Sequence, residues 1–264
     1  MTAPHERIVL GHLYGDLLNL YADRGNIITL RQRCAWRGIE LDVRQIGMAE
    51  VFHPGGFDML FIGGGQDGDQ RFMAEDLFRL KADGLRGALA DGVPMLVVCG
   101  GYQLCGHYYQ PAEGPRLPGL GLFDLHTVHP GQRVQRCIGN VVVEWTDDGQ
   151  GSGPEGGGRR TLVGFENHGG RTYLGAGARP LGRVLRGFGN NAQDGTEGAV
   201  VHHAYGTYLH GSLLPKNPHL ADHLLLLALR RRRPGATLAP LDDALEWRAH
   251  DVMVQRTMQG PQGR

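Results

Sequence analysis

The first hundred residues alternate between two hydrophobic patterns. Short apolar runs that end near glycines predict buried strands of a parallel sheet, and these runs are Arg7–Leu13, Ile39–Ile46, Asp58–Ile62 and Pro94–Val98. Apolar residues at helical spacing predict helices over Gly25–Arg37 and from about Asp69 to Leu89. Strands that alternate with helices predict a parallel sheet with right-handed crossovers, and ligands are expected beyond the carboxyl ends of its strands.

The pattern changes between Leu117 and Tyr208. Short strand-like runs separated by turn residues predict a more antiparallel, loop-rich second half, and the clearest runs are Val134–Glu144, Leu162–Glu166 and Gly198–His202. The glycine-rich stretch Asp147–Arg160 has too few apolar residues to pack. It is therefore predicted to be a flexible surface loop.

The C-terminal part predicts two helices, over Leu220–Arg230 and over Leu241–Met258, followed by a disordered end over Gln259–Arg264. We therefore expect an α/β protein with a three-layer α/β/α sandwich and a central, mostly parallel sheet over residues 6–217. Residues 218–264 are expected to form a helical extension that packs on this domain or on a partner.

Composition and charge exclude several classes of protein. The 264 residues include 27 basic and 27 acidic side chains, so the formal charge is zero and neither nucleic acid nor an anionic membrane surface is an expected partner. The N-terminal residues do not resemble a secretory leader, and no apolar stretch approaches the length of a membrane span. We therefore expect a cytoplasmic protein without membrane insertion.

Cysteine usage points away from structural cross-links. The four cysteines lie far apart without CxxC spacing, which predicts neither a disulfide framework nor a zinc site; they are Cys34, Cys99, Cys105 and Cys137. The pairs His202 and His203, and His126 and His129, have no carboxylate or cysteine at ligand spacing. We therefore expect no metal site.

Cys99 is the first candidate for chemistry. It ends the apolar run Pro94–Val98 and is followed by two glycines and a predicted helix. A strand–nucleophile–helix elbow places a side chain at the carboxyl edge of a sheet and at a helix N-terminus, where a thiolate is favoured. The alternative is that Cys99 is a small buried residue in a tight turn.

A cysteine nucleophile that attacks a carbonyl also needs oxyanion donors and a base. The backbone N–H of Gly100 and the Gly63–Gly65 corner could supply the donors, although such a corner is also typical of an ordinary tight turn. Of the 13 histidines, His210 has the most suggestive position, because a predicted strand runs into a loop there, ahead of the long helix.

Four sequence motifs resemble those of a known protein family. CGGYQ after an apolar strand, followed far downstream by GTYLHGSLLPKNP, resembles the class I, triad-type glutamine amidotransferases of the cobyric acid synthase (CobB/CobQ) type. Tyr14–Asn26 and Gly164–Gly170 are in addition similar to the GatD family, the glutaminase subunits of lipid II isoglutaminyl synthases, whose partner is the Mur-ligase-like MurT. The similarity runs from about Arg7 to Asn217.

The resemblance implies a role for each candidate residue. Cys99 is expected to be the nucleophile and His210 its general base and acid. The oxyanion donors expected from the glycine pattern itself are Gly100 and a glycine of the corner, Gly64. Gln103 matches a glutamine that helps to hold substrate. Arg136 matches the family's glutamine-binding arginine, whose guanidinium can clamp an α-carboxylate; the alternative is that Arg136 is an ordinary surface residue of a strand.

Two departures from the family pattern are visible. Many class I enzymes carry a glutamate two residues after the catalytic histidine, but Ser212 stands there, and Val97 replaces a frequent glycine two residues before the cysteine. A serine cannot supply the charge that fixes the tautomer of the histidine. We therefore expect either a Cys–His dyad or an acidic third group from another region or from the partner.

The function implied by the resemblance is that of a glutaminase subunit. It would hydrolyse L-glutamine and deliver ammonia to a MurT-like ligase, which amidates the D-glutamate α-carboxyl of lipid II in peptidoglycan synthesis. The chain has no GxxxxGK[ST] motif, and its only lysines are Lys81 and Lys216. We expect no cofactor in this chain, with ATP and Mg²⁺ on the partner of a heterodimer.

Three alternatives remain open from the sequence. The chain could serve cobyric acid or another carboxylate acceptor, it could be a cysteine amidohydrolase or peptidase that acts without a partner, or it could be a binding module in which Cys99 is only structural.

Overall fold

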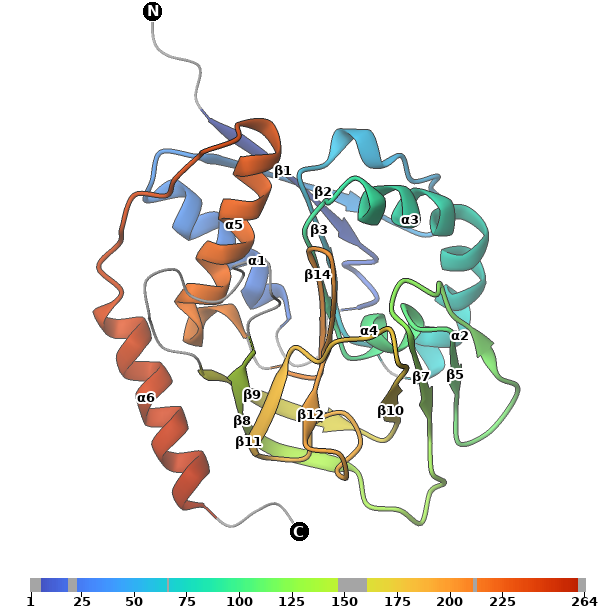
Figure 1. The fold of residues 1–264 in the computed structure, drawn as a ribbon. Helices are drawn as coiled ribbons and strands as arrows, with labels where there is room; N and C mark the ends of the chain where they lie inside the picture. The colour runs from blue at the N-terminus through green and yellow to red at the C-terminus, as the bar shows by residue number, and fades with distance from the viewer. Residues whose placement is uncertain (1–5, 19–22, 66, 147–160, 211–212, 261–264) are drawn as a thin grey trace, which may run out of the picture.

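The computed structural model describes residues 6–18, 23–65, 67–146, 161–210 and 213–260, and its centre is a six-stranded sheet (Figure 1). In sheet order β13-β14-β4-β3-β1-β2, every neighbouring pair is parallel except β13 and β14. The bounds are β1 (Arg7–Leu13), β2 (Glu40–Ile46), β3 (Met59–Ile62), β4 (Met95–Val98), β13 (Ala199–Val201) and β14 (Ala204–Thr207). The predicted central parallel sheet is confirmed.

Helices cover both faces of this sheet, which gives the expected α/β/α sandwich. Figure 1 shows α1 (Arg24–Ala35) and α5 (Pro218–Arg232) together on one side. The other side carries α2 (Asp67–Asp76), the π-helical turn η3 (Leu77–Lys81), α3 (Ala82–Ala90) and the single-turn helix α4 (Gly100–Leu104). Strands β3 and β4 are buried along their whole length, as their uninterrupted apolar sequences require.

The helix predicted from about Asp69 to Leu89 is interrupted by the π-helical turn. Asp76 and Lys81 are five residues apart, the spacing that a π turn places on one side of a helix, and they form a buried ion pair. Asp76 also accepts hydrogen bonds from the Tyr14 hydroxyl at 2.6 Å and from the Ala49 N–H at 2.7 Å. The turn therefore joins this helical segment to the ends of β1 and β2.

Two four-stranded sheets form the second half of the domain. One contains β5 (Tyr108–Gln110), β6 (Leu117–Pro118), β7 (Leu125–Val128) and β10 (Arg171–Leu174), and the other contains β8 (Cys137–Trp145), β9 (Thr161–His168), β11 (Gly182–Arg186) and β12 (Thr196–Glu197). All their pairs are antiparallel except β5 with β7, which agrees with the expected change of texture.

One strand boundary in this half differs from the predicted one. The strand predicted from Val134 begins only at Cys137, because the Val134 N–H is bonded to the Gly131 carbonyl in a turn. The predicted loop Asp147–Arg160 lies outside the described residues. Because β8 begins at Cys137, Arg136 lies directly before this strand and not within it.

The C-terminal helices differ in their burial. Leu220, Leu224 and Leu225 of α5 belong to the same apolar core as the central sheet. Helix α6 (Ala244–Gln259) packs along β8 and β9, where Trp247 stacks on His219 with ring centroids 5.0 Å apart. Gln259, which was expected to be disordered, is the last residue of α6, and 261–264 lie outside the described residues. Within the described ranges, no helix has the length and apolar character needed to cross a bilayer.

Arg33 joins α1 to both C-terminal helical segments. Its side chain is 1% exposed and its guanidinium contacts Asp222 of α5 and Asp243, the residue before α6, each at 2.6 Å. Arg37 also contacts Asp222 at 2.6 Å. These contacts satisfy a buried cation with two carboxylates.

Replacing Arg33 by alanine should lower the free energy of unfolding by about 3 kcal/mol, because two carboxylates lose their buried cation. Denaturant unfolding of the full chain measures the change, and Arg31→Ala on the exposed side of the same helix is the matched control. An equal effect of the two substitutions would contradict the role given to Arg33.

Candidate active site

Cys99 stands on a strained turn between β4 and α4. Its backbone has φ 48° and ψ −104°, a conformation that costs a non-glycine residue about 1–3 kcal/mol. The Cys99 N–H donates to the Thr207 carbonyl at 2.9 Å, which ties the turn to the end of β14. The predicted elbow is therefore present, and the sulfur-bearing side chain is held at the carboxyl edge of the central sheet.

His210 reaches Cys99 because β14 lies beside β4. Thr207 is paired with Val98 in parallel register, so the chain leaves both strands at the same edge. His210 is then fixed by two backbone hydrogen bonds with Phe165, at 2.7 and 3.2 Å. The two predicted residues, 111 positions apart in sequence by their numbers, are neighbours in the folded chain, because a Cβ at Gly64 would contact both of their side chains.

A third group is present that the sequence analysis did not identify. Asp23 is fully buried at the start of α1, and its Oδ1 lies 3.3 Å from Nδ1 of His210. Its Oδ2 accepts a hydrogen bond from the Gly64 N–H at 2.7 Å. Asp23 occurs within the Tyr14–Asn26 motif, and the available signal was an acidic residue following the first strand. The acidic group expected from another region is thus available within this chain.

The imidazole of His210 is surrounded by groups that favour its charged form. Burial alone would lower the pKa of His210, but the charge of Cys99 and the hydrogen bond with Asp23 raise it to about 10. An imidazolium beside the sulfur stabilises the thiolate. The helix predicted to follow Cys99 is the five-residue α4.

The backbone N–H of Gly64 makes a contact different from the one predicted for it. Its N–H is directed at Asp23, so in this conformation it is not available as the expected oxyanion donor. A Cβ at Gly64 would lie 2.5 Å from Cε1 of His210 and 3.2 Å from Cβ of Cys99. The missing side chain therefore makes room for the two reactive groups. Gly100 directly follows Cys99 as the first residue of α4.

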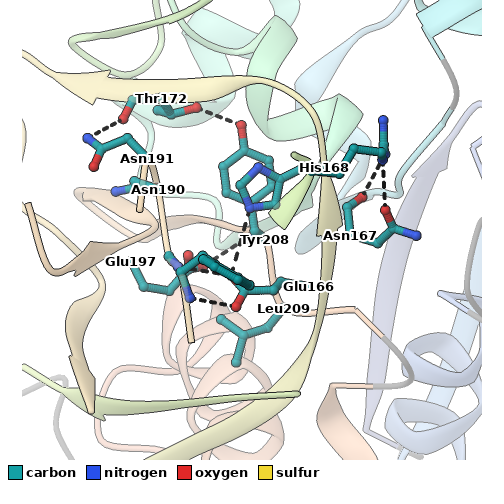
Figure 2. Close-up of polar contacts among 12 residues, drawn as sticks. Glu166, Asn167, His168, Thr172, Asn190, Asn191, Glu197, Tyr208 and Leu209 are labelled. Carbon is teal, nitrogen blue, oxygen red and sulfur yellow. Dashed lines mark hydrogen bonds and ion pairs between the residues drawn. The ribbon is translucent and has the colours of Figure 1, made fainter. Parts of the chain in front are cut away.

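Gln103 belongs to a buried, hydrogen-bonded cluster with Tyr208 and Thr172. Its side chain is 3% exposed, and its Nε2 donates to the Tyr208 hydroxyl at 3.0 Å. The same hydroxyl is 2.6 Å from Oγ1 of Thr172, and the Tyr208 ring stacks on His168 with centroids 3.6 Å apart (Figure 2). This hydrogen bond gives Gln103 a structural contact beside the substrate-binding role expected of it.

Arg136 is exposed and is oriented by Asn167. Its Nε donates to the Asn167 side-chain oxygen at 3.1 Å, and its Nη2 donates to the Asn167 carbonyl at 3.4 Å. The charges of Arg136 and His210 both act on the buried His168. Arg136 therefore lies beside Asn167, two residues along β9 from Phe165, which pairs with His210.

The side chains of Glu166 and Glu197 place two carboxyl groups in the interior of the domain. Oxygens of Glu166 accept the N–H groups of Phe188 and Gly189 at 2.7 and 2.9 Å (Figure 2). Oε1 of Glu197 accepts the hydroxyl of Thr207 and the N–H of Tyr208, each at 2.7 Å. Burial raises the pKa of both carboxyls to about 7.

The part of the chain that the structure describes contains no cluster of three or more His, Cys, Asp or Glu side chains able to hold a metal ion. His126 is instead stacked between Tyr108 and Tyr173, with ring centroids 5.1 and 5.5 Å away.

Comparison with known proteins agrees with this geometry. The profile of the CobB/CobQ-like glutamine amidotransferase domain matches residues 9–218. The chain is 40% identical to the lipid II isoglutaminyl synthase (glutamine-hydrolyzing) subunit GatD of Staphylococcus aureus, with 96% of each chain covered. The corresponding subunit of Streptococcus pneumoniae is 37% identical, with 84% of this chain and 81% of that protein covered.

Among solved structures, the glutaminase domain of Trypanosoma brucei CTPS with bound acivicin superimposes with a TM-score of 0.55. The match has 11% sequence identity and covers 88% of this chain and 96% of that chain. At this identity the similarity is one of fold.

The buried acid Glu197 predicts a pH dependence of stability. Its pKa of about 7 in the folded chain lies above that of an exposed glutamate, so its contribution is complete below the unfolded-state pKa and is lost as pH rises through 7. The free energy of unfolding should therefore decrease between about pH 5 and pH 8, and Glu197→Gln should reduce this decrease.

Denaturant titrations at several pH values measure both slopes. Glu50→Gln, which changes an exposed glutamate, is the control and should keep the wild-type slope. A Glu197→Gln variant with the wild-type slope would show that the carboxyl is already ionised in the folded chain.

Proposed function

Since this chain belongs to the CobB/CobQ-like glutamine amidotransferase family, we propose that it is the glutaminase subunit of a lipid II isoglutaminyl synthase. The observation that carries the chemistry is the convergence of Cys99, His210 and Asp23 around the bare backbone of Gly64. The similarity to GatD subunits over nearly the whole chain supports the choice of lipid II as the acceptor system.

In the proposed reaction, the Cys99 thiolate attacks the side-chain carboxamide carbon of L-glutamine. The negative charge that develops on the carbonyl oxygen is stabilised by the backbone N–H of Gly100. His210 gives its proton to the departing nitrogen, so ammonia leaves and a glutamyl thioester remains. Neutral His210 then takes a proton from water as it attacks the thioester, which releases glutamate and restores the pair.

Asp23 acts through His210 in this scheme. Its carboxylate fixes the ring orientation, keeps a proton on Nδ1 and stabilises the imidazolium that forms beside the thiolate. Arg136 binds the α-carboxylate of glutamine, which is the role carried over from the family. Gln103, four residues after the nucleophile, donates a hydrogen bond to the buried hydroxyl of Tyr208.

Delivery of ammonia requires a partner. Free ammonia in neutral water is mostly protonated and is then not a nucleophile, so it must pass directly to an activated carboxylate. The named relatives are subunits of a synthase, which supports the presence of a second chain. We assign that chain to the MurT-like, Mur-ligase type and place ATP and Mg²⁺ on it, because this chain has no phosphate-binding motif of the GxxxxGK[ST] type.

Reconstitution with the candidate ligase tests the function. The complex should amidate lipid II with either glutamine or ammonium as nitrogen source in the presence of ATP. Cys99→Ala should abolish the glutamine-dependent reaction and leave the ammonium-dependent one, because only the glutaminase step is lost. Amidation of cobyric acid instead of lipid II would refute the acceptor, and hydrolysis of small peptides without any ligase would refute the amidotransferase role.

Replacing Asp23 by asparagine should lower kcat for glutamine hydrolysis by about 10²–10⁴-fold, because the amide favours the wrong tautomer of His210. Glutamate release by the complex measures the effect, and Asp16→Asn, an exposed aspartate of the same segment, is the control. If Asp23→Asn retained kcat within a factor of two while folding normally, a Cys–His dyad would be sufficient.

A further inference from the structure

The backbone between Thr207 and His210 crosses the interior of the domain outside any strand. β14 ends at Thr207, and the next backbone pairing is the bridge between His210 and Phe165. Tyr208 and Leu209 lie between these two points, and both are fully buried. Buried N–H groups need hydrogen-bond acceptors. The N–H groups of these two residues therefore have to be satisfied by something other than a neighbouring strand.

The carboxyl group of Glu197 provides the acceptor. Its Oε1 accepts the N–H of Tyr208 and the hydroxyl of Thr207, each at 2.7 Å (Figure 2). Oγ1 of Thr207 in turn accepts the N–H of Leu209 at 3.0 Å. One side-chain oxygen therefore serves both N–H groups, one of them directly and the other through a single hydroxyl.

The backbone beside Glu197 is itself fixed. The Gly198 N–H donates to Oδ1 of Asn190 at 3.0 Å, and Nδ2 of Asn190 donates to the Gly198 carbonyl at 2.9 Å. Tyr102 of α4 donates its hydroxyl to the same Asn190 oxygen at 3.2 Å. Glu197 is thereby connected to the helix that follows the nucleophile, and it holds the end of β14 in a defined place relative to that helix.

The segment that Glu197 holds joins the two reactive residues. The carbonyl of Thr207 accepts the N–H of Cys99 at 2.9 Å, and His210 follows Thr207 by three residues. A displacement of this short segment would therefore change the separation of the sulfur and the imidazole. Reactions between fixed groups depend steeply on such separations.

We propose that Glu197 is a positioning residue for glutamine hydrolysis, which sets the separation of Cys99 and His210 by accepting hydrogen bonds from the chain that follows β14. The inference rests on the proposed function and adds to it a residue that acts through the backbone. Asp23 orients the ring of His210, whereas Glu197 places the backbone that carries this ring. Glu197 acts as a hydrogen-bond acceptor, so its oxygen atom is needed and its charge is not.

Two substitutions of Glu197 test this role in the reconstituted complex. Glu197→Leu removes the acceptor and should lower kcat for glutamine hydrolysis by about 10²-fold, the cost of a small misplacement of reacting groups. Glu197→Gln keeps an oxygen that accepts both hydrogen bonds and should restore most of kcat. The Kd for L-glutamine, measured with Cys99→Ala to prevent turnover, should be the same in all three backgrounds, because a positioning role acts on kcat.

A second pair of variants decides the question if Glu197→Leu does not fold. Thr207→Val removes the hydroxyl that connects Glu197 to the Leu209 N–H, and it should lower kcat by about tenfold. Thr207→Ser keeps a hydroxyl at the same position and should restore most of this loss.

Asp58 supplies the control for a general loss of stability. It is also a buried acid, and its Oδ2 accepts the N–H of Val9 at 2.7 Å. Asp58 directly precedes β3, so it lies at the amino end of the parallel sheet, whereas Cys99 follows β4 at the carboxyl end. Asp58→Ala should therefore lower the free energy of unfolding and leave kcat of the folded complex unchanged.

The outcomes separate this inference from the proposed function. A folded Glu197→Leu complex with wild-type kcat would overturn the inference and leave the function standing, as would equal kcat values for Glu197→Gln and Glu197→Leu. A loss carried entirely by a higher Kd for glutamine, or an equal loss of kcat in Asp58→Ala, would also overturn it. If Glu197→Leu is unfolded, equal kcat values for Thr207→Val and Thr207→Ser have the same meaning. A wild-type complex without glutaminase activity would refute the function itself.

Discussion

The buried carboxylate of Asp23 is the contact on which the assembled site depends. A charged group without water must have its lone pairs satisfied by the protein. One oxygen of Asp23 faces Nδ1 of His210, and the other accepts the N–H of Gly64. The carboxylate therefore holds the connection after β1, the corner after β3 and the loop after β14 in one arrangement. Loss of either contact leaves part of a buried charge without compensation.

This arrangement follows from the order of the strands. In a parallel sheet the carboxyl ends of neighbouring strands open onto one edge, and β1, β3, β4 and β14 are consecutive in the sheet. Strands β3, β4 and β14 each supply one part of the site just beyond their ends, and Asp23 stands at the start of α1, the helix that follows β1. The strained backbone of Cys99 is held on both sides, because its N–H donates to the Thr207 carbonyl and its carbonyl accepts the N–H of Gln103.

The sequence predicts those features that depend on local patterns. The elbow at Cys99 is visible because an apolar run and two glycines are adjacent, and His210 is recognisable within a longer motif. The partnership of Asp23 with His210 is not visible in this way, because it depends on which strands become neighbours. The sequence shows that the Gly63–Gly65 corner has no side chains, but only the fold shows that the Gly64 N–H is directed at Asp23.

The position of β14 has a consequence for biosynthesis. This strand lies between β4 and β13 in the sheet, yet it comes from residues 204–207, in the last quarter of the chain. Until residues 204–207 have been translated, one edge of β4 has no partner strand. The backbone N–H and C=O groups along that edge are then exposed and can pair with other strands. The nucleophile cannot meet its base until that late segment has emerged. The order of translation therefore delays assembly of the active site until the domain is nearly complete. During this interval the exposed edge of β4 is a site that chaperones can protect.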